Sequence, residues 1–213
     1  MAPFRKLTLQ GAGKCTRVCL AVYLPIWLAL AIAPVDRSDW LLENLLVFVA
    51  VPYLLGPRAR STLGCGSYVA IYCFLLLHAI GAHYTYSLVP VGDWFNWAAM
   101  DRNHYDRAVH FAFGLLITLP MQQHIRPLLQ MPVVGQSAVT LAVMLCCSAI
   151  YELMEWGAAV LFGGELGIAF VGAQGDPWDA HKDMALAGAG ALIALLSQLS
   201  GHLAATQNSR TPS

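Results

Sequence analysis

The chain has 213 residues, of which 58% are hydrophobic and only 11% are charged, and its net charge is zero. Soluble domains carry about a quarter of their residues as charged side chains. This deficit excludes an ordinary water-facing surface and indicates an integral membrane protein. The charge balance also argues against a nucleic-acid partner, which would require clustered Lys and Arg.

Six apolar segments follow one another along the chain, and each approaches the roughly 20 residues that a helix needs to cross a membrane. Backbone groups in lipid must be hydrogen-bonded internally, and these runs lack the alternation of a strand. We therefore predict an all-α, polytopic membrane bundle of about six transmembrane helices in a single domain, with a polar tail at 204–213. The predicted spans are 15–33, 40–56, 67–88, 105–124, 136–161 and 183–203.

Two segments depart from a plain apolar span. The second span is short and carries Glu43 and Asn44 near its start, so we expect it to be tilted little or to be packed inside the bundle. The loop between the third and fourth spans contains the aromatic stretch 92–97, which could lie flat in the membrane interface.

Basic residues fix the expected orientation. With six crossings, one side of the membrane receives most of them, and the positive-inside rule makes that side cytoplasmic. Both termini are therefore predicted to be cytoplasmic. The residues on this side are Arg5, Lys6, Lys14, Arg17, Arg58, Arg60, Arg126 and Arg210.

Acidic residues are absent from the predicted cytoplasmic loops. Three of them, Glu43, Glu152 and Glu155, lie within spans, and the other nine fall in outer loops or at outer helix ends. Acids contribute little to membrane orientation. Their placement therefore indicates a function for the outer side.

The fourth span begins with Asp106 and His110, which share one helical face because they are four residues apart. Such a pair can share a metal ion, or the carboxylate can orient the imidazole as a base. A plain hydrogen bond between helices is the alternative. In the fifth span Glu152 and Glu155 are three residues apart, and two acids so close need two partners, one divalent cation or one shared proton.

The sixth span is preceded by Asp176, Asp179 and Asp183. If the helix starts at residue 177, the last two acids share a face, and helix capping explains the first. Gly188 and Gly190 would let this helix pack closely on a neighbour.

These three motifs converge on the outer side. Carboxylates with one imidazole suit Mg²⁺, Mn²⁺, Zn²⁺ or non-haem iron. The predicted metal ligands are Asp106, His110, Glu152, Asp179 and Asp183, and His83 could add a further ligand. The six cysteines lack the spacing of a zinc or redox motif, so we expect them to be small apolar filler.

Four sequence blocks, HYTY at 83–86, RNHYDR at 102–107, YELMEW at 151–156 and QGDPWD at 174–179, resemble the YjdF family of bacterial inner-membrane proteins. The likeness covers most of the chain from the second span onward. It implies a multi-pass fold in the inner membrane and no assigned activity. A shorter pattern, formed by 106–111, Glu152 and the Asp179/Asp183 pair, is similar to VanZ-like membrane proteins and implies a role in the cell envelope.

Three functions follow from these residues. The first is a metal-dependent hydrolase that acts on a lipid-linked or cell-envelope substrate, with Glu155 as general base and with Glu152 and His110 at the catalytic centre. The second is a small proton-coupled transporter in which Glu152 and Glu155 titrate. The third is a structural or accessory membrane protein whose polar cluster only fixes helix packing.

Overall fold

A computed structural model of the chain describes residues 3–91, 102–162, 164 and 173–208. Within these residues the chain forms helices and turns and contains no strand, so the predicted all-α class is confirmed. The aromatic stretch 92–97, predicted to lie in the membrane interface, falls outside the described residues.

Six long helices coincide with the six predicted spans. They are α1 (Pro3–Leu30), α2 (Arg37–Leu54), α4 (Cys65–His83), α6 (Tyr105–Ile125), α7 (Val133–Phe162) and α9 (Asp179–Asn208), with the short α3 (Pro57–Thr62) and η1 (Arg126–Leu128) between them. Four of the six, α1, α4, α7 and α9, are long and apolar enough to cross a membrane. The other two carry more polar side chains, and their crossing stays a prediction.

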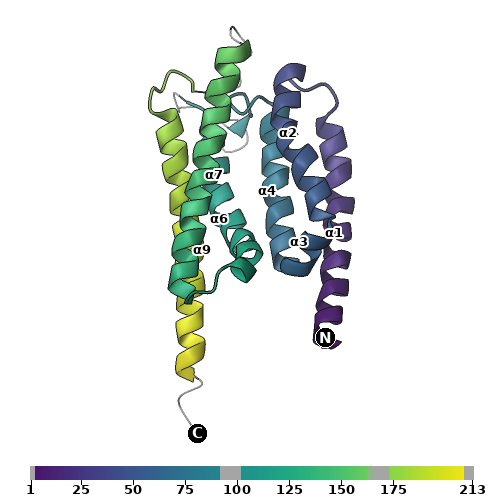
Figure 1. The fold of residues 1–213 in the computed structure, drawn as a ribbon. Helices are drawn as coiled ribbons and strands as arrows, with labels where there is room; N and C mark the ends of the chain where they lie inside the picture. The colour runs from purple at the N-terminus through teal and green to yellow at the C-terminus, as the bar shows by residue number, and fades with distance from the viewer. Residues whose placement is uncertain (1–2, 92–101, 163, 165–172, 209–213) are drawn as a thin grey trace.

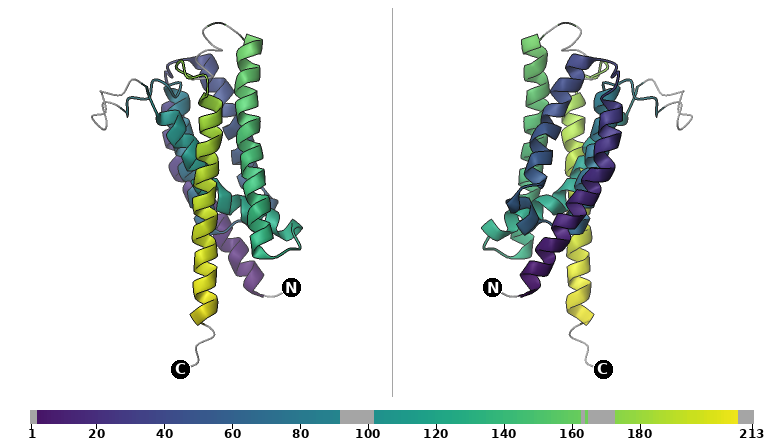
Figure 2. Two further views of the ribbon diagram at one scale, coloured as in Figure 1. Left: turned by 90° about the vertical axis from the view of Figure 1, so that its left-hand side faces the viewer. Right: turned by 90° about the vertical axis from the view of Figure 1, so that its right-hand side faces the viewer.

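The helices form two groups that lie side by side (Figure 1). In one group α1 and α2 pack on α4, and in the other α6 and α7 pack on α9. Packing of α4 against α6 joins the groups. The start of α1 and the end of α9 lie at the same end of the bundle, as the two side views in Figure 2 also show.

Close backbone packing fixes the register of α6 on α9, which run in the same direction. A Cβ atom on Gly114 would overlap the carbonyl oxygen of Ala187, and one on Gly190 would overlap that of Phe111. The predicted close approach at Gly190 is therefore confirmed, whereas a Cβ on Gly188 would meet only the side chain of Leu145. Only glycine permits helices to approach this closely.

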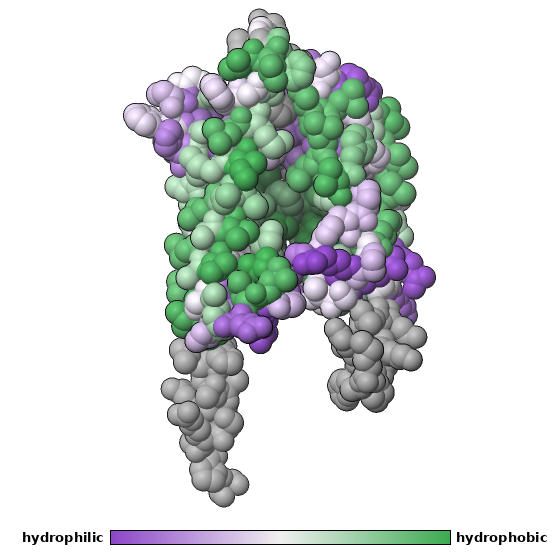
Figure 3. All heavy atoms as spheres, viewed as in Figure 1, coloured by the Kyte–Doolittle hydropathy of each residue, from purple (hydrophilic) through white to green (hydrophobic). Residues whose placement is uncertain are grey.

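Large apolar side chains cover the outside of the bundle. Figure 3 shows hydrophobic residues over the middle of one face and hydrophilic residues toward its upper and lower margins. Val49 is 72% exposed and Leu161 is 81% exposed. A soluble protein rarely exposes a continuous apolar surface of this kind, whereas hydrocarbon solvates it.

A turn after α4 brings a tyrosine back onto the helix. The helix ends at His83, before the predicted boundary at residue 88. Thr85 and Tyr86 then adopt φ values of 53° and 50°, in the left-handed region that side chains disfavour. The backbone N–H of Tyr86 donates to the carbonyl of Gly81 at 2.8 Å. The Tyr86 ring occupies the space where a Cβ of Gly81 would lie.

The expectation that all six cysteines are apolar filler is wrong for two of them. Cys15 of α1 and Cys65, the first residue of α4, form a disulfide. They are 50 residues apart in sequence and meet only because α1 packs on α4, so no local spacing signals the pair. The free cysteines are Cys19, Cys73, Cys146 and Cys147.

Candidate metal centre

The crossing of α6 and α9 brings three predicted ligands together. One helical turn from the Gly114–Ala187 contact, toward the start of both helices, lie His110 and Asp183. Asp106 lies one turn nearer the start of α6 than His110. Ligand atoms of Asp106, His110 and Asp183 all lie within 4.8 Å of one another. Atoms bound to one metal at about 2.0–2.2 Å can be at most about 4.4 Å apart, so an ion would draw the three slightly closer.

A fourth predicted ligand approaches from α7. The Glu152 Oε1 atom lies 3.5 Å from His110 Nε2, and the same nitrogen lies 3.5 Å from Asp106 Oδ1. Both distances exceed the usual 2.7–3.2 Å range of N–H···O hydrogen bonds. The imidazole therefore stands between two carboxylates without binding tightly to either.

Two carboxylate oxygens in this group are buried without a hydrogen-bond partner among the described residues. They are Asp183 Oδ1 and Glu152 Oε1, and Asp183 is only 2% exposed. Burial of an unpaired carboxylate is strongly unfavourable. A bound cation or a proton at these oxygens would remove that penalty.

Glu155 is buried on the same face of α7 as Glu152, almost one turn further along the helix. It does not belong to the three-residue group defined by Asp106, His110 and Asp183. Its assignment as a general base stays a prediction.

Asp179, the fifth predicted ligand, is paired with arginines. Its Oδ1 atom accepts from Arg102 Nη2 at 2.5 Å and from Arg107 Nη2 at 3.2 Å. These ion pairs tie the start of α9 to the start of α6, one turn above Asp183. The sequence contains both arginines next to acids, but their pairing with a segment some 70 positions away could not be predicted. The role of Asp179 as a ligand stays a prediction.

Asp176 extends this ion-pair network toward the surface. Its Oδ2 atom accepts from Lys182 Nζ and from Arg107 Nη2, both at 2.5 Å, and its Oδ1 accepts from the Trp178 backbone N–H. The bond from Lys182 contributes most to lowering the pKa of Asp176 well below its ordinary value, followed by that from Trp178. The carboxylate therefore stays charged and holds the two helix starts together.

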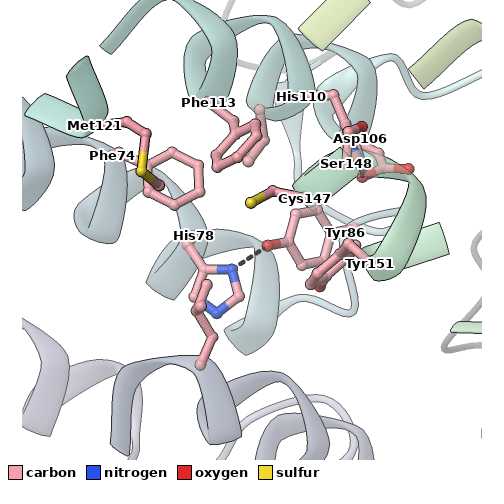
Figure 4. A pocket seen from close by; sticks show the side chains of 12 residues that line it. Phe74, His78, Tyr86, Asp106, His110, Phe113, Met121, Cys147, Ser148 and Tyr151 are labelled. Atoms are coloured by element: carbon pink, nitrogen blue, oxygen red, sulfur yellow. Dashed lines mark hydrogen bonds and ion pairs between the residues drawn. The ribbon is translucent and has the colours of Figure 1, made fainter. Parts of the chain in front are cut away.

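A cavity of about 230 Å³ adjoins the predicted metal ligands. Asp106 and His110 line its polar part, and Phe74, Phe113 and Met121 line its apolar part (Figure 4). The predicted ligand group thus opens onto an apolar space between the two helix groups.

A second polar set, which sequence reasoning did not identify, reaches the same cavity through His78, Tyr86 and Tyr151. The His78 Nε2 atom lies 3.0 Å from the carbonyl oxygen of Glu43, which can only accept, so Nε2 carries the proton. Tyr86 O–H then donates to His78 Nδ1 at 2.6 Å (Figure 4). Beside the cavity, Tyr151 O–H of α7 donates to Glu43 Oε2 of α2 at 2.7 Å. The one sequence feature that indicates this set is Glu43, a glutamate inside the short second apolar span.

His83, considered above as a further ligand, points elsewhere. Its Nδ1 atom lies 2.7 Å from the carbonyl oxygen of Leu30 and therefore donates to it. The bond ties the end of α4 to the end of α1.

These features define an all-helical membrane protein with a buried carboxylate and histidine group beside an apolar cavity. Residues 15–202 match the family model described as "Predicted membrane protein (DUF2238)", and the chain belongs to this family. It is similar to "Inner membrane protein YjdF" of Escherichia coli (strain K12), with 36% identity over 167 residues that cover 76% of this chain and 78% of the relative. No solved structure matches the chain. The resemblance inferred from the four sequence blocks is thus confirmed.

Proposed function

We propose that this protein is a membrane-embedded hydrolase that depends on a divalent metal ion. The observation that carries the proposal is the buried Asp106, His110 and Asp183 group, in which Asp183 Oδ1 has no hydrogen-bond partner among the described residues. Glu152, whose Oε1 atom lies 3.5 Å from His110 Nε2, is outside this three-residue group and is the candidate for a fourth ligand. Three carboxylates and one imidazole favour Mg²⁺, Mn²⁺ or Zn²⁺.

The surrounding residues suit hydrolysis at the membrane surface. When bound, such an ion supplies an acidified water and polarises a phosphoryl or carbonyl oxygen. Glu155, buried almost one turn beyond Glu152, would serve as the proton acceptor beside such an ion. Because the ligands adjoin an apolar cavity, the substrate is a lipid-linked or cell-envelope molecule whose reacting group lies at the outer helix ends.

The proposed location is the bacterial inner membrane, as the name of the relative from Escherichia coli states for that protein. All six long helices cross it, and both termini are cytoplasmic because Lys14, Arg17, Arg58 and Arg60 lie at that end.

The disulfide offers a test of this orientation. Cytosolic thiols are kept reduced, so we expect Cys15 and Cys65 to be thiols in growing cells and to pair in air during purification. A membrane-permeant maleimide added before lysis should label both. A disulfide already formed before lysis would contradict the cytoplasmic placement of this end.

A proton-coupled transporter is the second candidate. The observation in its favour is Glu43, a buried acid that accepts a hydrogen bond from Tyr151 and lies 4.0 Å from the buried His78. Such intramembrane acids occur in proton relays. In this case Glu152 and Asp183 would hold protons rather than share a metal ion.

Metal content separates the two candidates. We would grow cells with added Mn²⁺, Zn²⁺ and Mg²⁺, purify the protein in detergent and measure bound metal by elemental mass spectrometry. Near-stoichiometric metal that is lost in the Asp106→Asn/Asp183→Asn double variant supports the hydrolase. Asp36→Asn is the matched control, because Asp36 caps α2 away from the site and Asn keeps the cap. Metal-free wild-type protein in all three media contradicts the proposal.

A further inference from the structure

We propose that the cavity holds the apolar chain of a single-chain lipid with an anionic headgroup, and that this chain enters sideways between α2 and α7. The inference deepens the proposed function. The position of the headgroup, which would meet the metal ligands, rests on that function, whereas the position of the chain rests on the geometry of the cavity.

The cavity has the polarity of an amphipathic ligand. Asp106 and His110 line it at the start of α6, and Phe113 and Met121 line it further along the same helix. From Asp106 to Met121 the helix rises about 22 Å, at roughly 1.5 Å per residue. The lining therefore changes from charged to apolar along the depth of the membrane, as does a lipid that stands upright in one leaflet.

The opening of the cavity faces hydrocarbon. Leu46 of α2 lines it from one side, and Cys147 and Tyr151 of α7 line it from the other. Leu46 is 37% exposed, so the cavity reaches the surface at this point, and Figure 3 shows a recess between the two helix groups. Neighbouring Leu45 and Ile150 are about half exposed and apolar. A ligand that enters here comes from the bilayer and not from water.

The size of the cavity selects one chain. About 230 Å³ is below the roughly 300–1,000 Å³ of pockets that enclose a drug-sized molecule. A space this small favours one slender chain, which can extend through the opening, over two chains or a ring system. The Tyr151–Glu43 hydrogen bond joins α7 to α2 about one turn nearer the outer end than Cys147 and Leu46, so the chain enters below that bond. The headgroup lies beside His110, whose ring is 5.9 Å from that of Tyr151.

Photocrosslinking tests this assignment. The wild-type protein in nanodiscs is irradiated with two diazirine-bearing probes, a long-chain fatty acid and a long-chain monoalkyl phosphate, each with and without an excess of its unlabelled analogue. We expect competable labelling of peptides that contain Phe113 or Met121 with at least one probe. Labelling that is not competed, or that is confined to outward-facing residues such as Leu153, overturns the inference.

Adjacent cysteines provide a matched pair of variants. Cys147 lines the cavity, whereas Cys146 is exposed on the outside of α7. Cys147→Trp should reduce competable labelling by about tenfold, equivalent to about 1.4 kcal/mol, and Cys146→Trp should leave it unchanged. Equal labelling of the two variants overturns the inference. If Cys147→Trp does not fold, Leu46→Trp at the opening replaces it, with Leu45→Trp as its control.

Metal content, measured beside labelling, distinguishes failure of this inference from failure of the proposed function. Labelling of the cavity in a protein that never binds metal would overturn the hydrolase proposal and leave the chain site standing. Stoichiometric metal without competable labelling would overturn the chain site alone.

Discussion

The two walls of the cavity differ in whether the buried polar groups at each wall have hydrogen-bond partners. On the wall formed by α2 and α4, His78 uses both ring nitrogens, and Glu43 accepts from Tyr151. On the wall lined by α6 and α7, Glu152 of α7 and Asp183 of α9 lie next to the lining residues Asp106 and His110. Glu152 and Asp183 each bury an oxygen without a hydrogen-bond partner in the described part of the chain. We call these the partnered wall and the acidic wall.

This difference separates a structural role from a binding role. A buried polar group that has its partners stabilises the fold, whereas one without them needs a ligand or a proton. Lack of a partner alone is not sufficient, however. Both carboxylate oxygens of Asp39 are also buried and unpartnered in the described structure, but this residue lies in the first turn of α2, where the helix dipole favours an acid. The acidic wall is distinguished by three potential metal ligands, Asp106, His110 and Asp183, that converge.

The largest expected effect comes from the contact that positions the acidic wall. Gly114→Val would drive a side chain into the α9 backbone at Ala187, where nothing can move aside. We expect destabilisation at or above the upper end of the roughly 1–3 kcal/mol typical of overpacking, together with loss of bound metal. Thermal melting and metal analysis of the purified protein would measure both.

Gly157→Ala is the control for that variant, because a Cβ at this position of α7 meets no atom within 4 Å. It should be neutral or stabilise the helix by up to about 1 kcal/mol. If Gly114→Val melts like Gly157→Ala, the close crossing of α6 and α9 does not fix the site.

Asp183→Asn should abolish the response of the protein to metal. In the wild type, an ion present at a hundred times its dissociation constant would stabilise the fold by about 2.7 kcal/mol. We expect the melting temperature of the wild type to rise with Mn²⁺ and to fall with EDTA, and that of the variant to change with neither. In EDTA the variant should be at least as stable as the wild type, because it removes a buried charge. An equal Mn²⁺ response in both proteins would remove Asp183 from the ligand set.

Much of the fold follows from the sequence, because lipid allows few alternatives. Each apolar run forms a helix, and Gly190 indicated a close helix contact, although the closest approach is at Gly114, which the sequence did not single out. The pairing of helices was not predictable, because a continuous apolar run does not identify the face that meets a neighbour. This is why the Cys15–Cys65 disulfide was missed, while the free Cys146 and Cys147 agree with the expectation of apolar filler.

The candidate site was predictable where its residues share a helix. The spacing of Asp106 and His110 placed them on one face of α6, and the outer position of Asp183 suggested that it would join them. For Asp179 the sequence could not distinguish a metal ligand from an arginine partner, because Arg102 and Arg107 reach it from another segment. No sequence motif singles out His78, and only the turn that returns Tyr86 onto α4 places this pair in the cavity wall.

Tyr86→Phe tests the partnered wall. The substitution removes the hydroxyl that donates to His78 Nδ1 and leaves that nitrogen buried without a partner. We expect a loss of stability of about 1–3 kcal/mol with unchanged metal content, measured by melting and elemental analysis. Tyr84→Phe, at a half-buried tyrosine two residues earlier, should change stability by no more than about 0.5 kcal/mol. Loss of metal in Tyr86→Phe would show that the two walls form one site.

Lys182→Met should have the smallest effect, because half of this side chain is exposed to solvent. The bond from Lys182 is the main reason that the pKa of Asp176 is lowered, so the variant should raise this pKa toward its ordinary value. A lowered carboxyl pKa stabilises the fold above the pKa of the unfolded chain, and this stabilisation is lost as the pH falls toward the folded value. The wild type should therefore melt slightly above Lys182→Met at pH 7, and the difference should shrink as the medium becomes acidic. Metal binding should not change, because the ion-pair network ties the helix starts above the acidic wall and contributes no ligand from Lys182. A difference that instead grows toward low pH would show that another group controls the stability of this end of the bundle.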